Sequence, residues 1–472
     1  MKKVVLLRSF IRFTSISVFL ILISQQVLAQ NGTVLNKSFT ASSLEGRKVS
    51  VAIYLPYGYS DSGEPYRLYL YLHGAAGMTG SGMTSSFKPV LDRLIQNTEI
   101  KPMVVAFPTL NTLSPSTNSL NLHMFIDSPI NGNVGTAITQ DLMDYLAANY
   151  NIATTREERA IGGFSMGGYG APRIAITNSD KFGAFVADEP FMIAVEEFRQ
   201  TYLLEMLKKY GLTPPYDFNV DTSNPWGHIE AYSWLGVATA FSPNLIDPNI
   251  PTYQTDFPVD STGNIIPEVF DEVWIAQNDP ATLIKNSDMY TDWLALPQPR
   301  PKYPLGMYFS AHTGASYVDI VSDGNKLFTD RFDSDLNGLG IEHTYNIHND
   351  MSGHTLTATD VEEGLKFVDQ TMNAATSVSD ERLAVSDPEF ILHQNYPNPF
   401  NAATEISFEM EKPGHVRLVV YDVKGREVKV LADRDFSEGF HEIVWNAIDQ
   451  HSGTYFYRIE GYSDIKKTTL VK

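Results

Sequence analysis

The chain has 472 residues, 43% of them hydrophobic and 12% aromatic, which is enough apolar side chain for two or three folded domains. Its formal net charge of −20 argues against nucleic acid or an anionic membrane surface as a partner. There are no cysteines, so disulfides, thiolate nucleophiles and cysteine-ligated metals are excluded.

Residues 1–29 have the pattern of a signal peptide. A positively charged head is followed by the apolar run Ser15–Ile23 and by the small residue Ala29 at the expected cleavage point before Gln30. The apolar run is short for spanning a bilayer, so an uncleaved anchor is the weaker alternative. We therefore expect an exported protein with no transmembrane span after cleavage.

Between residues 30 and 373, short apolar segments alternate with amphipathic segments of helical length. This alternation is typical of an α/β fold with a mostly parallel central sheet covered on both faces. The predicted strands are Val49–Leu55, Arg67–Leu72, Met103–Phe107, Arg159–Gly162, Phe185–Ala187, Leu305–Ser310 and Glu342–Ile347, and the predicted helices are Phe87–Asn97, Ile138–Asn149, Gly168–Asn178, Asn325–Leu336 and Val361–Met372.

Two glycine-rich loops follow predicted strands. Gly163-Phe164-Ser165-Met166-Gly167 has the spacing of a nucleophile elbow, in which small residues permit a tight strand-to-helix turn and leave the serine exposed. The backbone N–H of Met166 would then lie at a helix start, where negative charge is stabilised, and the early loop His73-Gly74-Ala75 supplies the N–H of Ala75 as a second donor to an oxyanion. A plain turn or a phosphate loop is the alternative for the early loop, which lacks the Gly-Lys-Ser/Thr ending.

Residues 189–301 interrupt the alternation with a segment rich in proline, asparagine and aromatic residues. A long irregular insertion in a compact domain is usually a lid or binding loop, and a peripheral excursion without function is the alternative. Its aromatic side chains could form a platform for sugar or pack in a core. They are Tyr216, Trp226, Tyr232, Trp234, Tyr253, Trp274, Tyr290 and Trp293.

A serine nucleophile needs a base and an acid, which in α/β-hydrolases follow it in the order acid, then histidine. His354 lies in a loop between a predicted strand and the final helix, so it is the predicted base. For the acid, Asp319 and Asp323 lie between the strand Leu305–Ser310 and the next helix. Asp319 is favoured because Asp323, followed by glycine, could instead cap that helix.

Two sequence patterns resemble metal-binding sites only in part. Asp333 to Gly338 begins like a calcium-binding loop, but Thr344 stands where a bidentate glutamate is needed, so a helix end with Gly338 or Gly340 as the stop is preferred. His343, His348 and His354 lack the HExxH spacing of a zinc site. We expect neither a metal nor an organic cofactor.

The last part of the chain changes character. Residues 374–388 have the composition of a linker. From residue 389 to 472, short alternating segments separated by turn residues predict a small all-β sandwich. The predicted strands are Thr404–Met410, Val416–Asp422, Glu427–Leu431, His441–Trp445, Gly453–Tyr457 and Lys466–Val471.

His73-Gly74-Ala75, the run Gly163 to Gly170 and Ser352-Gly353-His354 together resemble the esterase D-like family of α/β-hydrolases, over about residues 36 to 372. That family includes S-formylglutathione hydrolases, feruloyl and acetyl-xylan esterases, and mycolyltransferases. The resemblance implies Ser165 as nucleophile, His354 as base, and Ala75 with Met166 as oxyanion donors. The sequence departs from the family at the acid, where a short Gly-x-x-Asp turn is replaced by the segment from Ser310 to Asp319.

The tail is similar to a type A sorting domain of the type IX secretion system, over about residues 390 to 472. The resemblance rests on His393 to Asn401, Val420 to Gly425, Gly453 to Tyr457 and the basic pair Lys466-Lys467. It implies export across an outer membrane by that machinery, with the tail removed or used for surface attachment. A carbohydrate-binding or spacer sandwich is the alternative.

Together these features predict a secreted serine esterase that uses a triad of Ser165, His354 and Asp319. Its expected substrates are acetyl or feruloyl esters on plant polysaccharide. The alternatives are a non-catalytic surface-displayed binding protein on a hydrolase fold, or an acyltransferase or peptidase that uses the same triad.

Overall fold

The computed structural model describes residues 31–75, 78–113, 121–191, 214–215, 236–245, 254–313, 319–350, 354–383, 390–422, 426–459 and 465–472. Within them the chain divides into two compact units. The first runs to Ser287 and resumes at Lys302–Met372, and the second comprises Asp288–Pro301 and Asn373–Lys472. The predicted signal peptide lies outside the described residues. No helix among the described residues is long and apolar enough to cross a bilayer.

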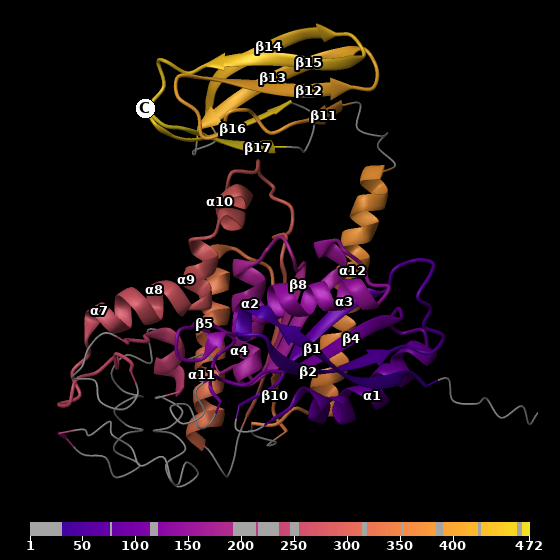
Figure 1. The fold of residues 1–472 in the computed structure, drawn as a ribbon, viewed down its shortest axis with the longest axis vertical. Helices are drawn as coiled ribbons and strands as arrows, with labels where there is room; N and C mark the ends of the chain where they lie inside the picture. Colours follow the sequence, from indigo (N-terminus) through magenta and orange to yellow (C-terminus); the bar gives the residue numbers. More distant parts are fainter. Residues whose placement is uncertain are drawn as a thin grey trace, which may run out of the picture. The chain divides into compact units, whose positions relative to one another are not determined.

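The first unit is built on an 8-stranded sheet with the order β1-β2-β4-β3-β7-β8-β9-β10 (Figure 1). The strands are β1 (Thr33–Ala41), β2 (Arg47–Leu55), β3 (Arg67–Leu72), β4 (Met103–Thr109), β7 (Arg159–Phe164), β8 (Ala184–Asp188), β9 (Gly306–His312) and β10 (Thr344–His348). From β4 to β10 every neighbouring pair is parallel, whereas β1 and β2 are antiparallel to their neighbours. The predicted mostly parallel α/β fold is confirmed.

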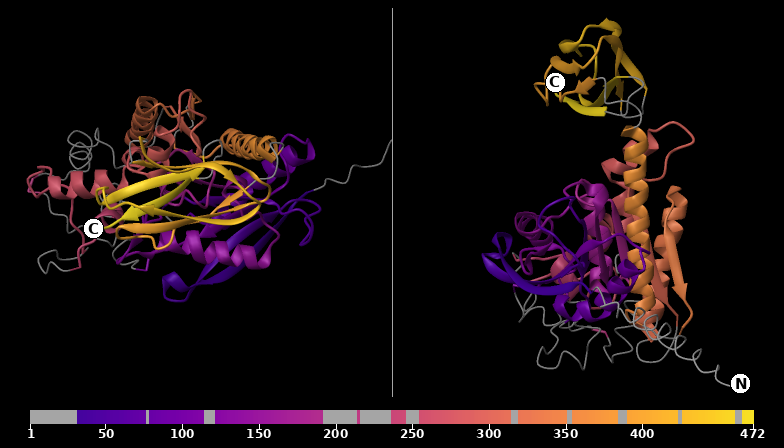
Figure 2. Two further views of the ribbon diagram at one scale, coloured as in Figure 1. Left: turned by 90° about the horizontal axis from the view of Figure 1, so that it is seen from above. Right: turned by 90° about the vertical axis from the view of Figure 1, so that its right-hand side faces the viewer.

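Helices cover both faces of this sheet. They are α1 (Gly80–Gln96), α2 (Val134–Thr136), α3 (Met143–Asn149), α4 (Met166–Thr177), α11 (Asp319–Leu339) and α12 (Ala358–Leu383), with α2 and α3 joined by a π-helical segment at residues 137–142. Neighbouring residues of β9 show the two faces: the ring of Tyr308 packs on Phe367 of α12, and that of Phe309 packs on Phe332 of α11. The long helices α11 and α12 are clearest in the right-hand view of Figure 2.

The central strands have no polar face, because helices cover both sides of the sheet. All residues of β3 are buried, because a parallel strand between two helical layers has no side in water. On one face, the apolar side chains of α1 and α12 close over the sheet in a single cluster that includes Phe87 and Leu365. Because these strands are parallel, their C-terminal ends lie along one edge of the sheet, where α/β folds place their ligand-binding sites.

Several helices begin or end away from their predicted positions; α1, for example, begins at Gly80 rather than at Phe87. Helix α11 starts at Asp319 and continues through Leu339, so the calcium-like stretch from Asp333 lies inside a helix, and Gly340 ends it with a φ of 71°. Helix α12 continues through Leu383, so its backbone covers part of the segment predicted as a linker.

The insertion is described only in part. Its described helical segments include residues 236–241, α7 (Pro267–Val269), a π-helical segment at residues 270–275, α8 (Ala276–Asn278) and α9 (Pro280–Lys285) in the first unit, and α10 (Asp288–Leu294) in the second. The Tyr169 hydroxyl of α4 donates to the carbonyl of Asn278 at 2.7 Å, which ties this part of the insertion to the helix behind Ser165. The predicted helix Phe198–Tyr210 lies outside the described residues.

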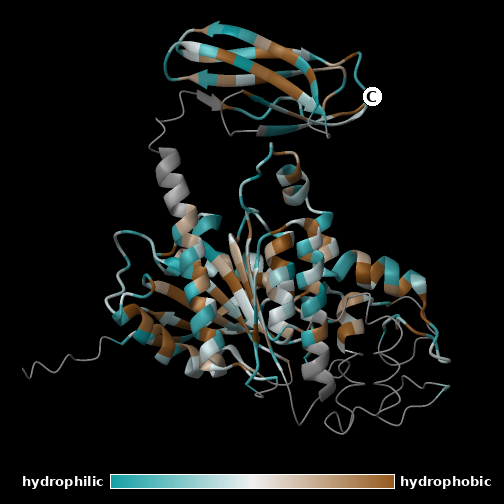
Figure 3. Ribbon diagram, turned by 180° about the vertical axis from the view of Figure 1, so that it is seen from behind, coloured by the Kyte–Doolittle hydropathy of each residue, from teal (hydrophilic) through white to brown (hydrophobic). Residues whose placement is uncertain are grey.

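The tail folds into two antiparallel sheets, β11-β12-β15 and β14-β13-β16-β17. The strands are β11 (Phe390–Leu392), β12 (Ala403–Met410), β13 (Gly414–Asp422), β14 (Glu427–Phe436), β15 (Gly439–Asn446), β16 (Gly453–Ile459) and β17 (Ile465–Leu470). Polar and apolar residues alternate along them (Figure 3), and the apolar side chains, such as Trp445 and Tyr457, form a core of their own. The predicted all-β tail is confirmed.

Candidate active site

Ser165 lies on a strained turn between β7 and α4. Its φ of 57° and ψ of −114° are unusual for a residue with a side chain, and such strain is typical of a functional position. Two glycines make the turn sterically feasible. A Cβ on Gly163 would lie 2.4 Å from the backbone of Gly167, and one on Gly167 would lie 2.3 Å from the carbonyl oxygen of Leu72. The described geometry is that of a nucleophile elbow.

His354 meets this serine from the loop between β10 and α12. Its Nε2 lies 2.9 Å from Ser165 Oγ, and its ring stacks on Phe164 with 4.9 Å between centroids. The structure thus brings together the two residues that the sequence paired. The imidazole is 21% exposed, so it lies at the edge of the sheet rather than in the core.

The carboxylate beside the imidazole belongs to Glu189, which directly follows β8. Its Oε2 lies 3.1 Å from His354 Nδ1, and its Oε1 accepts the backbone N–H of His312. Glu189 is 1% exposed and holds a φ of 46°. Its own N–H donates to the carbonyl of Ser310 at 3.1 Å, so contacts to β9 fix both its backbone and its side chain.

This arrangement differs from the prediction of Asp319, with Asp323 as its alternative. Both residues belong to α11, which begins at Asp319, and their side chains lie outside what the structure describes. The imidazole nitrogen that needs a carboxylate is already bonded to Glu189. The reason is strand order: β8 lies next to β7, the strand that leads to Ser165, so the end of β8 comes close to the imidazole.

A second acid, Asp188, lies just before Glu189 in a different environment. Tyr71 and Ser310 donate to its two oxygens at 2.7 and 3.1 Å. Burial, with the nearby Asp360 carboxylate, raises the pKa of Asp188 well above its usual value. The two consecutive acids therefore differ in partner: Asp188 is held by hydroxyl groups inside the sheet, and Glu189 faces the histidine.

The loop after β3 approaches the serine. A Cβ on Gly74 would lie 3.4 Å from Ser165 Cβ, so the Gly74–Ala75 peptide lies beside Ser165. Met166, the other predicted donor, is buried at the first position of α4. Its N–H is among those that a helix leaves unpaired at its start.

His73 fixes the orientation of the Gly74–Ala75 peptide. Its Nε2 accepts the N–H of Leu110 at 3.1 Å, so its Nδ1 carries the proton and donates to the carbonyl of Gly74 at 2.6 Å. In a trans peptide the C=O and N–H point in opposite directions. With the Gly74 carbonyl turned to His73, the N–H of Ala75 points away from that ring. The sequence suggested Ala75 but gave no role to His73.

Two buried imidazoles share this corner. His123 Nε2 lies 3.3 Å from the carbonyl of Leu110, and its Nδ1 accepts the N–H of Phe125 at 3.1 Å. Burial lowers the pKa of His73, and burial together with the neighbouring His73 lowers that of His123 to about 3. Both rings are therefore neutral at neutral pH and act as fixed hydrogen-bonding groups.

Comparison with known proteins identifies the family. The model of the family described as "Putative esterase" matches residues 41–285, which is 245 of 472 residues. The chain belongs to this family. The family is one of esterases, enzymes that cleave ester bonds. A second model, described as "Secretion system C-terminal sorting domain", matches residues 394–472 and indicates an exported protein, either released or attached at the cell surface.

Individual relatives are distant. The chain is 29% identical over 147 residues to endo-1,4-beta-xylanase Y of Acetivibrio thermocellus, and the match covers 29% of this chain but only 12% of that protein. A solved ferulic acid esterase is similar with a TM-score of 0.46 at 16% identity, covering 73% of this chain and 99% of that one. A fluorophosphonate-binding serine hydrolase of Staphylococcus aureus is similar with a TM-score of 0.42 at 14% identity, covering 72% and 98%.

Proposed function

We propose that this serine hydrolase cleaves carboxylic esters with a triad of Ser165, His354 and Glu189. The observation that carries the proposal is the unbroken series of contacts from Ser165 Oγ to His354 Nε2 (2.9 Å) and from His354 Nδ1 to Glu189 Oε2 (3.1 Å). A hydroxyl, an imidazole and a carboxylate in this order are the groups that acyl transfer through a serine requires.

In the acylation step Ser165 Oγ attacks the ester carbonyl while His354 Nε2 takes its proton. The imidazole then carries a positive charge, which the Glu189 carboxylate stabilises while it holds the ring in one orientation. His354 gives the proton to the departing alcohol, and an acyl-enzyme remains. Water, deprotonated by the same imidazole, attacks the acyl-enzyme; the bond between the acyl carbon and Ser165 Oγ then breaks, the imidazolium returns its proton to Oγ, and the acid leaves.

The oxyanion that forms in both steps is assigned to the backbone N–H groups of Met166 and Ala75. Support comes from the position of Met166 at the start of α4 and from the 3.4 Å approach of Gly74 to Ser165. Fixed donors of this kind act without reorganisation at the moment of reaction. His73 positions the second donor through the Gly74 carbonyl.

For the substrate we infer acyl groups, acetyl or feruloyl, on plant polysaccharide. The local similarity to a xylanase and the sorting domain support this class, because an exported enzyme meets polymeric substrates outside the cell. The aromatic residues of the insertion add less support. Trp274, Tyr290 and Trp293 are buried and pack in cores, and the other five lie outside the described residues.

The first test is labelling with a fluorophosphonate probe. We expect the wild-type protein to label at Ser165 and Ser165→Ala to remain unlabelled, with both variants unfolding at the same temperature. Equal labelling of the two proteins would remove Ser165 from the mechanism.

The second test compares substrates: p-nitrophenyl acetate, methyl ferulate, acetylated xylan, S-formylglutathione and a peptide amide. We expect turnover of the esters, with methyl ferulate or acetylated xylan preferred over S-formylglutathione. Faster hydrolysis of the amide than of any ester would contradict the proposal, and preference for S-formylglutathione would overturn the polysaccharide assignment while leaving the triad in place.

A further inference from the structure

A second polar cluster lies at the ends of the next two strands. His312 is the last residue of β9, His348 is the last residue of β10, and Asp360 lies in the first turn of α12. His348 pairs with His312 in the parallel register, so the two side chains emerge on the same face of the sheet. Their rings stack with 4.8 Å between centroids.

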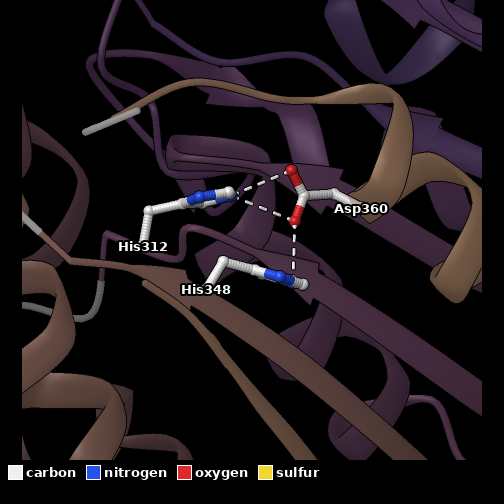
Figure 4. A group of neighbouring side chains, drawn as sticks. All are labelled: His312, His348 and Asp360. Atoms are coloured by element: carbon white, nitrogen blue, oxygen red, sulfur yellow. Dashed lines mark hydrogen bonds and ion pairs between the residues drawn. The ribbon is translucent and has the colours of Figure 1, made fainter. Parts of the chain in front are cut away.

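Both imidazoles point at one carboxylate (Figure 4). His312 Nε2 lies 3.1 and 3.0 Å from the two oxygens of Asp360, and His348 Nε2 lies 3.3 Å from Asp360 Oδ1. One donor atom from each residue falls within 4.8 Å of the others. Two imidazole nitrogens and a carboxylate oxygen converging in this way are a common ligand set for transition metals.

Hydrogen bonding does not account for the whole cluster. Thr357 donates its backbone N–H and its hydroxyl to Asp360 Oδ2, each at 2.7 Å, which leaves Oδ1 to the two imidazoles. Among the described residues, the buried Nε2 of His348 makes no hydrogen bond, although carboxylates lie near it. A buried polar atom of this kind calls for a partner such as an ion.

The surroundings also suit a cation. His312 Nδ1 is 2.9 Å from Asp350, and a metal-binding histidine usually donates its other nitrogen to a carboxylate in this manner. Glu363 Oε2 lies 3.3 Å from His348 Nε2, so three carboxylates surround two imidazoles. The Asp350 side chain is 46% exposed, whereas those of His312 and Asp360 are buried.

The geometry points to a binding site for a divalent transition-metal ion such as Zn²⁺, held by His312 Nε2, His348 Nε2 and Asp360 Oδ1. A structural zinc site has four ligands, and the fourth is supplied by Glu363, whose Oε2 lies 3.3 Å from His348 Nε2, or by water. This revises the expectation that no metal is involved. Only His348 was among the histidines weighed for zinc, because the other ligands become neighbours through the fold alone.

The site adjoins the proposed triad without sharing a side chain with it. The backbone N–H of His312 donates to Glu189 Oε1. An ion held by the His312 side chain would therefore anchor the residue that also positions the triad acid. We assign the ion this structural role.

The test measures zinc binding to the full chain after chelator treatment. Calorimetry gives the affinity, and elemental analysis after gel filtration gives the number of ions per chain. We expect a single tightly bound ion per chain. X-ray absorption should report imidazole nitrogen ligands at about 2.0–2.1 Å. Asp350→Asn should weaken binding by about 10–100-fold, because it removes only the partner of a ligand. His348→Ala removes a ligand and should weaken binding by more.

The matched control is His415→Ala in the tail, where an exposed histidine lies between Asp433 and Asp435 and could bind zinc adventitiously. It should leave the tight site intact, as should Ser165→Ala, which separates this proposal from the proposed function. Loss of tight binding in His415→Ala but not in His348→Ala would overturn the site. So would X-ray absorption without imidazole ligands, or the absence of zinc from folded wild-type protein at micromolar concentration.

Discussion

The histidines on either side of the nucleophile differ in what their ring nitrogens contact. On the β3 side, His73 and His123 bond to backbone groups, and burial keeps both rings neutral. On the β9–β10 side, His312 lies between the carboxylates of Asp350 and Asp360. There burial opposes the charge, but hydrogen bonds to Asp360 and Asp350 outweigh it and raise the pKa of His312 to about 9.

His354 lies between these two regions and combines their features. One ring nitrogen faces the carboxylate of Glu189, and the other faces the neutral hydroxyl of Ser165. A ring with backbone partners alone has no reason to gain a proton, and one between two carboxylates keeps its proton until a metal ion bound at that nitrogen displaces it. We expect that a carboxylate on one side and a hydroxyl on the other let the imidazole of His354 accept a proton and give it up again.

The largest expected effect is that of removing the shuttle. His354→Ala should lower kcat/KM for an ester substrate by at least about 10⁴-fold, because both proton transfers depend on this ring. His343→Gln is the control: His343 bonds to Asp333 at 2.8 Å, away from the serine, and its variant should keep activity within about threefold. Steady-state kinetics with p-nitrophenyl acetate measures both, and equal losses would show that the wrong histidine had been assigned.

The acid provides the next test. Glu189→Gln removes the charge beside His354 while keeping the shape of the side chain, and kcat should fall by about 10³–10⁴-fold. Asp319→Asn should change kcat by less than about threefold. Steady-state kinetics on the two variants decides which residue is the acid. A larger loss of kcat in Asp319→Asn than in Glu189→Gln would restore the acid predicted from the sequence.

A smaller effect is expected at His73. His73→Phe removes the hydrogen bond that holds the Gly74 carbonyl and should lower kcat by about 10²-fold, comparable to the loss of one oxyanion donor. KM for the same ester should hardly change, since the contact acts in the transition state. A rise in KM with an unchanged kcat would instead indicate that His73 only shapes the binding site.

The smallest effect concerns stability at acid pH. Because the folded-state pKa of His123 is lowered to about 3, the unfolded chain binds a proton more readily than the folded one between about pH 6.5 and 3. The free energy of unfolding should therefore fall with falling pH, by about 1.4 kcal/mol per pH unit for this residue.

His123→Gln removes that proton site and should flatten the acid limb of the stability curve by about this slope. Urea unfolding at several pH values between 4 and 7 measures it. The plots of unfolding free energy against pH should differ in slope between the wild type and His123→Gln, whatever the stability of each protein at pH 7. Parallel curves would mean that the ring is charged in the folded protein, and the contrast between the β3 and β9–β10 regions would fail.

Local sequence determined the features that depend on neighbouring residues. The glycines around Ser165 specify a turn too tight for larger side chains, so the elbow was visible without the fold. The alternation of apolar and amphipathic segments predicted the α/β architecture and the all-β tail. The strand β1 was missed because its residues are mostly exposed or half-buried and form no apolar run.

Tertiary structure decided which side chains meet. Glu189 directly follows a predicted strand, but only the order β7-β8-β9 and the contact itself show that this strand end reaches the imidazole. His312, His348 and Asp360 are likewise far apart in sequence and are joined by the parallel register of β9 and β10 and by the first turn of α12. A turn depends on a few adjacent residues, whereas a site at the ends of parallel strands depends on strand order, which is set by the packing of the whole sheet.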